Sequence, residues 1–134
     1  MNEFTLYFLE ESEKTIIWDF NGVKIKNNYY KKILKEICEK EVTTLNARIE
    51  VVKKITKRRN NVPLYINHQL LFFKIKATPN IWINYFNVLE YEPENEKTRV
   101  IFKNGTTLLI NKRIKYLKKT IRMIKKITFY TQKK

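Results

Sequence analysis

The sequence contains few of the residues from which catalytic and metal sites are usually built. Histidine, aspartate and cysteine each occur once, as His68, Asp19 and Cys38, and there are two glycines, Gly22 and Gly105. One histidine is too few for a histidine-based metal cluster, and we expect no Ser-His-Asp triad around it. Both glycines follow an asparagine in a predicted turn, which leaves no glycine-rich phosphate loop. We therefore expect a non-enzymatic protein without a cofactor or a bound metal.

Long apolar runs are also missing. No stretch approaches the roughly 18 apolar residues that a membrane-spanning helix requires, and the early acidic residues are not typical of a signal peptide. A lone cysteine cannot form an internal disulfide, which is typical of a reducing compartment. We therefore expect a cytoplasmic protein. Its 134 residues, 43% of them hydrophobic, are enough for one domain with its own core, spanning residues 1–134.

Positive charge is abundant and unevenly distributed. The net charge is +15, yet residues 1–50 contain 8 Lys or Arg against 9 Asp or Glu, a net of −1. Residues 51–134 contain 20 against 4, a net of +16, and no acidic residue follows Glu96. A random composition would spread this charge over the chain. The asymmetry therefore indicates an interaction surface for an anionic partner in the C-terminal part.

The pattern of the first 55 residues predicts strands followed by helices. Alternation over 3–9, a β-rich run over 14–20 and a hairpin at Asn21-Gly22 predict a three-stranded meander in the first 26 residues. A helix is predicted over 29–40, with Asn27 or Asn28 as its cap. A second helix over 45–55, opened by Thr43 or Thr44, is favoured, although its β-branched residues leave a strand open.

The middle of the chain predicts a basic loop and further strands. The segment 53–61 is expected to leave the helix as a loop, because two asparagines and Pro63 follow its basic residues. Strands are predicted over 64–66 and 70–75, joined around Asn67-His68, and another over 86–91. The fold class that we expect is α+β, with antiparallel strands and about three helices.

A hairpin followed by a basic helix is predicted at the C-terminal end. Strands over 100–103 and 106–110 flank Asn104-Gly105, a sequence typical of a two-residue hairpin turn. Asn111 is expected to cap the helix that follows. The apolar stripe of that helix contains Ile114, Leu117, Ile121, Ile124 and Thr128. Residues 129–134 are expected to form a frayed tail.

The side of this helix opposite the apolar stripe carries only positive charge, so its basic side chains repel one another. A merely soluble helix would mix the two signs of charge. We interpret this side as an anion-binding surface, with nucleic acid as the leading partner. We expect the helix to contact the DNA backbone. The arginines of the basic loop are expected to enter a groove, since a guanidinium fits a narrow A-tract minor groove. The predicted DNA-binding residues are Lys53, Lys54, Lys57, Arg58, Arg59, Lys74, Lys76, Lys112, Lys115, Lys118, Lys119, Arg122, Lys125 and Lys126.

Four blocks of residues occur in a fixed order in the C-terminal two-thirds. They are Val62-Pro63-Leu64-Tyr65-Ile66-Asn67, Leu70-Leu71-Phe72-Phe73, Asn80-Ile81-Trp82-Ile83 and Thr98-Arg99-Val100-Ile101-Phe102-Lys103-Asn104-Gly105. Together with the basic helix, over residues 46 to 127, they resemble the competence transcription factor (ComK) family. Residues 1–45 carry little of the match. The last strands and helix also resemble, loosely, a LytTR DNA-binding domain.

This resemblance implies a cytoplasmic activator that binds A/T-rich promoter DNA, largely through the minor groove. It also implies a homodimer that can assemble into tetramers, that bends DNA and that cooperates with RNA polymerase. The sequence departs from the family pattern in three places. Phe73-Lys74-Ile75 lacks the family's proline, Ala47-Arg48 replaces Gly-Arg, and the last helix is unusually rich in lysine. These departures bear on the preferred DNA site more than on the fold.

Three other functions are weighed against DNA binding. The principal alternative is a basic module that binds RNA or another protein. A basic amphipathic helix can also lie on an anionic membrane, but here the hairpin before the helix needs its apolar stripe as core. Glu94-Asn95-Glu96-Lys97 resembles half of a metal-dependent nuclease site. That site would need an aspartate at a strand end, and Asp19 is the only aspartate.

Overall fold

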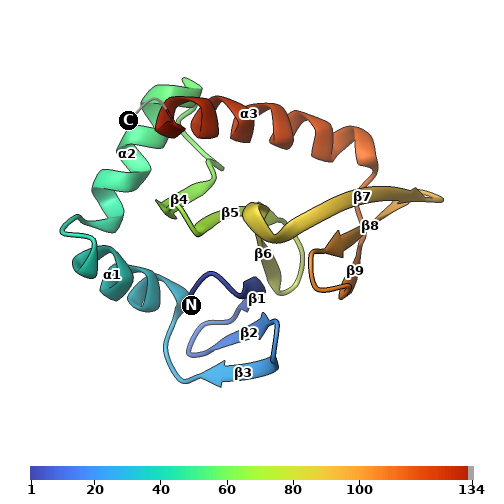
Figure 1. Ribbon diagram of the computed structural model, residues 1–134, viewed down its shortest axis with the longest axis horizontal. Helices are drawn as coiled ribbons and strands as arrows, with labels where there is room; N and C mark the ends of the chain where they lie inside the picture. Colours follow the sequence, from blue (N-terminus) through green and yellow to red (C-terminus); the bar gives the residue numbers. More distant parts are fainter. Residues whose placement is uncertain (133–134) are drawn as a thin grey trace.

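The computed structural model describes residues 1–132, which form two antiparallel sheets and three α-helices (Figure 1). The elements, in chain order, are β1 (Thr5–Glu10), β2 (Thr15–Asp19), β3 (Gly22–Lys26), α1 (Tyr30–Lys40), α2 (Leu45–Thr56), β4 (Leu64–Asn67), β5 (Leu70–Ile75), β6 (Asn80–Asn84), the 3₁₀ turn η1 (Tyr85–Asn87), β7 (Val88–Glu94), β8 (Lys97–Phe102), β9 (Thr107–Ile110) and α3 (Ile114–Gln132). The predicted α+β class with three helices is confirmed.

The larger sheet has six strands in the order β3-β2-β1-β6-β5-β4. Its central strands are covered on both faces, so that Leu6, Phe8, Phe72 and Ile83 are fully buried. A strand buried on both faces has a nearly continuous apolar sequence instead of an alternating one. This explains the uninterrupted run Leu70-Leu71-Phe72-Phe73, which forms the first four residues of β5.

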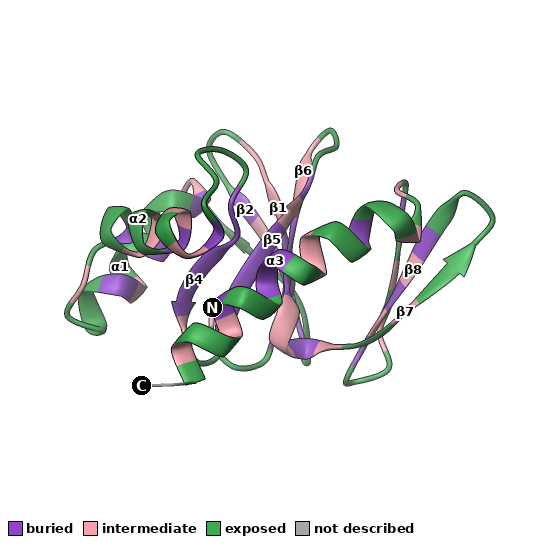
Figure 2. Ribbon diagram, turned by 90° about the horizontal axis from the view of Figure 1, so that it is seen from above, coloured by how far each residue is buried: buried purple, intermediate pink, exposed green. Residues whose placement is uncertain are grey.

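Different elements cover the two faces of this sheet. Helices α1 and α2 pack on one face, around Phe8, Tyr30 and Trp82, and Figure 2 shows both helices on the same side. The other face packs against the three-stranded sheet β7-β8-β9, where the rings of Tyr7 and Phe102 stack with centroids 5.6 Å apart. Helix α3 leads from this second sheet back to α2 (Figure 1), so the segment 45–56 and the C-terminal helix lie side by side.

Two details of the N-terminal predictions are wrong, one turn and one cap. The β2–β3 turn consists of Phe20 and Asn21 and not of Asn21-Gly22, because Gly22 already pairs with Asp19 in the sheet. The meander forms as β1-β2-β3, and the segment 45–55 is helical, with the hydroxyl of Thr44 accepting a hydrogen bond from the amide of Ala47 at 3.0 Å. The cap predicted at Asn27 or Asn28 is wrong, because α1 begins one residue after Tyr29 and no side chain caps it. The backbone carbonyl of Asn28 instead accepts a hydrogen bond from the Thr15 hydroxyl at 2.8 Å.

The strand predicted over 86–91 is displaced. Residues 80–84 form β6, and β7 begins only after the turn η1. Two buried asparagines hold this corner. The Asn84 amide donates to the carbonyls of Thr5 and Gln69, at 2.9 and 3.0 Å, and the Asn87 amide donates to that of Thr5 at 2.7 Å. Buried polar groups are stable when they are hydrogen-bonded, so the asparagines fix the place where the chain changes sheets. Sequence periodicity carries no signal for that change.

The β8–β9 hairpin forms where it was predicted, but its turn is longer. The amide of Gly105 donates to the carbonyl of Phe102 at 2.9 Å, and the Phe102 amide donates to the carbonyl of Thr106 at 2.8 Å. Gly105 has a φ of +89°, whereas Asn104 is not left-handed. This is a three-residue loop with one left-handed glycine, so the predicted two-residue turn is wrong.

Helix α3 begins later and ends later than predicted. It begins at Ile114, because the Lys112 carbonyl accepts a hydrogen bond from the Thr98 hydroxyl at 2.7 Å and holds this segment against β8. Asn111 is therefore not its cap. The helix continues to Gln132, so the predicted tail is wrong over 129–132, and residues 133–134 lie outside the described part. No helix within residues 1–132 is long and apolar enough to cross a membrane.

Candidate nucleic-acid interface

The loop between α2 and β4 presents Arg58 and Arg59 to solvent. Lys57, the C-cap residue just after α2, has a left-handed backbone with a φ of 57°, and Asn61 has one with a φ of 54°. The exposed residues 58–60 are thus held between two sharp bends. The loop is shorter than the predicted 53–61, because Lys53 and Lys54 belong to the last turns of α2.

A cleft of about 270 Å³, which we name the first cleft, lies between this loop, β5 and α3. Four cationic side chains from three separate segments line it: Arg58, Lys74, Lys76 and Lys119. No carboxylate lines the cleft, and none of the four cations takes part in an ion pair within residues 1–132. Its positive charge is uncompensated. The cleft therefore suits an anion.

Lys74 is held in place at the edge of the first cleft. It pairs across the sheet with Trp82, and its ammonium nitrogen lies 5.6 Å from the centroid of the Trp82 ring. The indole N–H of Trp82 in turn donates to a carboxylate oxygen of Glu10 at 2.8 Å. A cation over an indole face gains stability without losing its charge. Lys74 is half-buried and lines the first cleft, so it can hold its position over Trp82 and keep its charge at the cleft edge.

A second cleft, of about 220 Å³, lies on the other flank of the loop. Its cationic residues are Lys31, Lys53, Arg59 and Lys74, so that Lys74 borders both clefts. Lys53 is 3.5 Å from Glu50 in an exposed pair, which neutralises it only weakly. Lys31 was missed by the sequence analysis because it belongs to the N-terminal half, whose net charge is close to zero. Only the packing of α1 beside the loop reveals it.

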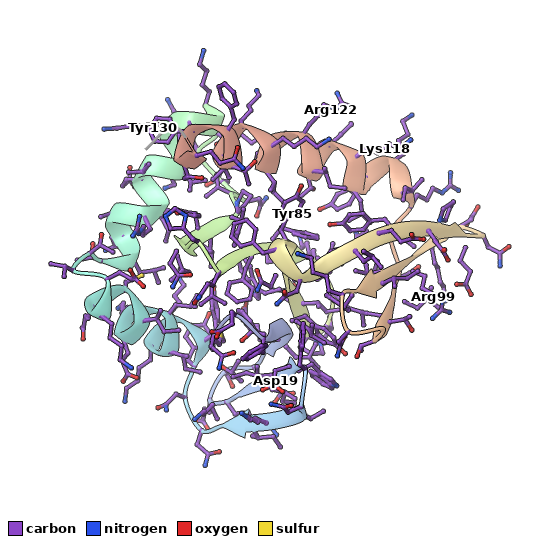
Figure 3. All side chains as sticks on the ribbon, in the orientation of Figure 1. Asp19, Tyr85, Arg99, Lys118, Arg122 and Tyr130 are labelled. Carbon is purple, nitrogen blue, oxygen red and sulfur yellow. The ribbon has the colours of Figure 1, made fainter. Side chains whose placement is uncertain are left out.

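The seven predicted basic residues around α3 do not all lie together. Lys119 lines the first cleft, while Lys118 and Arg122 point outward from the helix (Figure 3). The buried side contains Leu117, Ile124 and also Met123 and Ile127, the last two of which the predicted stripe omitted. The other basic residues of the face are exposed or half-buried: Lys112, Lys115, Lys118, Arg122, Lys125 and Lys126.

Two further predicted residues lie at a groove between α2 and the end of α3. Lys54 and Lys126 flank it, and Val51, Phe129 and Tyr130 form much of its wall. These apolar side chains are largely exposed. This groove is more apolar than either cleft beside the loop. Lys54 and Lys126 are therefore separated from the four residues of the first cleft.

Glu90, Glu92 and Glu94 form an exposed row on β7, in the second sheet. Arg99 of β8 binds Glu94 through two contacts of 2.6 and 3.1 Å, which lowers the pKa of Glu94. A side-chain hydrogen bond with Glu90, desolvation and repulsion from Glu90 raise the pKa of Glu92. Asp19 lies in the first sheet, apart from Arg99 (Figure 3). Within residues 1–132, no three His, Cys, Asp or Glu side chains form a group that could hold a metal ion.

The single histidine lies in a turn and the single cysteine lies in the core. His68 lies in the β4–β5 turn, with its Nδ1 atom 3.4 Å from the Tyr65 hydroxyl. Cys38 is fully buried on the inner side of α1, and burial raises the pKa of its thiol. A buried thiol of raised pKa is a poor nucleophile.

Comparison with known proteins gives one family. The family model described as ComK protein matches residues 2–134. The match therefore also includes the N-terminal 45 residues, in which the sequence blocks showed little similarity. No curated protein and no solved structure matches the chain.

Proposed function

Because the chain belongs to the ComK family, a family of competence transcription factors, we propose that it is a cytoplasmic activator that binds A/T-rich promoter DNA. The observation that supports this most strongly is the first cleft. There, Arg58, Lys74, Lys76 and Lys119 meet from three segments with no carboxylate among them. Uncompensated cations on one surface are the electrostatic footprint of a nucleic-acid-binding protein.

In the proposed complex, the loop and the helix have different tasks. Duplex DNA carries one negative charge about every 1.7 Å of its axis, and each phosphate that the protein neutralises releases counterions. Lysines of α3 would contact phosphates and position the protein without reading the sequence. Arg58 and Arg59 project from the narrow loop, and arginine is favoured in the narrow, strongly negative minor groove of A/T-rich DNA. Site preference would then arise from groove shape.

The proposal includes assembly. Family membership supports a homodimer that can form tetramers on DNA and that cooperates with RNA polymerase. Sedimentation of the protein alone and with a promoter duplex measures this part of the proposal. One protomer per duplex at every protein concentration would contradict it.

Binding measured as a function of salt tests the central proposal. Fluorescence anisotropy of a labelled duplex should give a log–log slope of several units, because several phosphates are neutralised. Single-stranded DNA, single-stranded RNA and anionic vesicles serve as competitors. We expect the duplex to be preferred. Preference for RNA or for vesicles would instead support one of the alternative functions, and absence of duplex binding would reject the proposal.

The arginine loop is tested by Arg58→Ala with Arg59→Ala. This variant should lose preference for an A/T-rich duplex over a G/C-rich one, beyond its general loss of affinity. Lys26→Ala with Lys40→Ala is the matched control, since it removes the same charge from exposed residues that line neither cleft. Equal loss of preference in both variants would show that net charge, and not the loop, determines selectivity.

A further inference from the structure

The second cleft has the character of a separate anion site. Lys31, Lys53, Arg59 and Lys74 line it, and no carboxylate does. Lys31 forms no ion pair within residues 1–132. The cleft lies on the opposite flank of the loop from the first cleft, and the two share only Asn61 and Lys74. An anion bound in one cleft therefore leaves most of the charge of the other uncompensated.

The start of α1 adds to the positive potential of this cleft. Tyr30 and Lys31 line the cleft and are also the first two residues of the 11-residue helix. The positive end of the helix dipole lies there, and the first amides of a helix lack intrahelical acceptors. No side chain caps this end, and no acidic residue occurs in the first turn. Lys31 and Lys32 instead add like charge to the dipole, an arrangement that destabilises a helix.

We propose that the second cleft binds a backbone phosphate of the DNA strand opposite to the strand whose phosphate occupies the first cleft. This inference rests on the proposed function. A loop that enters a groove has one phosphate backbone on each flank, and each flank of residues 58–60 has its own cation-lined cleft. Lys74 stands between them, ordered by Trp82. The unfavourable lysine at the start of α1 is thereby explained, since it contributes to binding and not to folding.

The chain offers a matched pair of variants for the test. Lys31 lines the cleft, whereas its neighbour Lys32 is also exposed, lies on the same helical turn and lines neither cleft. Lys31→Ala should lower the slope of log affinity against log salt by about 1 and the affinity by about fivefold near 0.15 M salt. Lys32→Ala should leave both nearly unchanged. Both substitutions should keep or raise Tm, because each relieves repulsion with the helix dipole.

Three measurements decide the outcome. If wild-type protein binds duplex DNA and Lys31→Ala behaves like Lys32→Ala, the second phosphate site is overturned while the proposed function stands. If the wild-type protein binds no duplex, the proposed function fails and this inference fails with it. In the remaining measurement, inorganic phosphate and chloride are compared, at the same ionic strength, as competitors of duplex binding. Stronger competition by phosphate than by chloride against wild type, but not against Lys31→Ala, would show that the duplex and phosphate compete for the cleft at Lys31, as a backbone-phosphate site requires.

Modified duplexes test whether the two clefts contact opposite strands. Uncharged methylphosphonate linkages, placed one at a time in each strand, locate the phosphates that wild-type protein needs. The affinity of Lys31→Ala should become insensitive to one linkage in one strand. The affinity of Lys76→Ala, a variant of the first cleft, should become insensitive to a linkage in the other strand. If both variants lose sensitivity in the same strand, the two clefts follow one backbone and the proposed arrangement is wrong.

Discussion

The ammonium group of Lys74 lies 5.6 Å from the centre of the Trp82 ring, at the ridge that separates two cation-lined clefts. The two residues face each other across β5 and β6. Trp82 is itself fixed by its hydrogen bond to Glu10, 2.8 Å long. One buried aromatic residue therefore determines where a cation stands relative to both clefts. Core packing is in this way connected to the proposed DNA contact.

Lys74→Met tests this connection. The unbranched apolar side chain should keep its contact with the Trp82 ring while the charge is lost, so stability should change little. Affinity for duplex DNA should fall by at least fivefold near 0.15 M salt, an order of magnitude set by one lost phosphate contact. Anisotropy titrations and thermal unfolding measure the two effects. A variant with unchanged salt slope would show that Lys74 does not contact DNA.

Neighbouring lysines on α3 give a second prediction. Lys119 lines the first cleft, and Lys118 points away from it by about 100° around the helix. Lys119→Ala should therefore lower the salt slope by about 1. Lys118→Ala should have a smaller effect, through long-range attraction that salt screens. Equal effects would mean that the whole basic face, and not the cleft side of α3, contacts the duplex.

The sequence predicts the elements better than their meeting points. The apolar stripe of α3 shows which side of the helix is core, because that information is local and periodic. The stripe cannot show that Lys119, alone among the seven basic residues, lines the first cleft together with Arg58 and Lys76. That depends on how α3 crosses β5, which is determined by contacts between residues far apart in the chain. Charge counting likewise passes over Lys31, since its own half of the chain is nearly neutral.

Polar residues with partners far away in the sequence explain why parts of the fold prediction were wrong. Periodicity predicted a strand over 86–91, whereas Asn84 and Asn87 end β6 and turn the chain into the second sheet. An asparagine whose partners lie 79 or 82 residues away in sequence carries no local signal. The start of α3 is similar, because the bond from Thr98 to the Lys112 carbonyl delays the helix.

Asn84 provides a stability prediction. Its side chain makes three hydrogen bonds to backbone groups, and the residue is fully buried. Asn84→Leu leaves the amide of Leu71 and two carbonyls without these partners, so unfolding free energy should fall by about 3 kcal/mol or more. Urea unfolding measures this loss. Asn46→Leu, at an exposed position of α2, is the control and should change stability little. A loss below about 1 kcal/mol would show that water replaces these bonds.

The acidic row on β7 predicts a dependence on pH. The pKa of Glu92 is raised, first by its hydrogen bond with Glu90. A carboxyl group with a raised folded-state pKa stabilises the fold below its unfolded pKa, and this contribution is lost as pH rises through the folded value. Glu92→Gln removes that dependence. Relative to wild type, the variant should gain stability as pH rises from 4 to 7, measured by urea midpoints. Glu13→Gln, on an exposed loop, is the matched control, and an equal gain in both variants would contradict the assignment to Glu92.

The end of α1 contains a residue that is poorly suited to its backbone. The amide of Val42 donates to the Glu39 carbonyl and that of Thr43 to the Cys38 carbonyl, both at 3.0 Å. This pair of bonds defines a helix end at which a left-handed glycine is preferred. Val42 has a φ of 57° there, although it is β-branched, and its side chain is 94% exposed. Its substitution therefore removes strain without opening a cavity.

Val42→Gly should raise the unfolding free energy by about 1 kcal/mol, the left-handed penalty of a side chain less the entropy cost of glycine. For a chain of this length, Tm should rise by about 3 °C. Val42→Ala keeps the Cβ atom and should gain little. Thermal unfolding of the three proteins separates the two effects, and duplex binding should be equal in all of them, since Val42 lines neither cleft. A lower Tm for Val42→Gly than for Val42→Ala would mean that the backbone at this position is not left-handed in solution, because only a positive φ makes glycine the better residue.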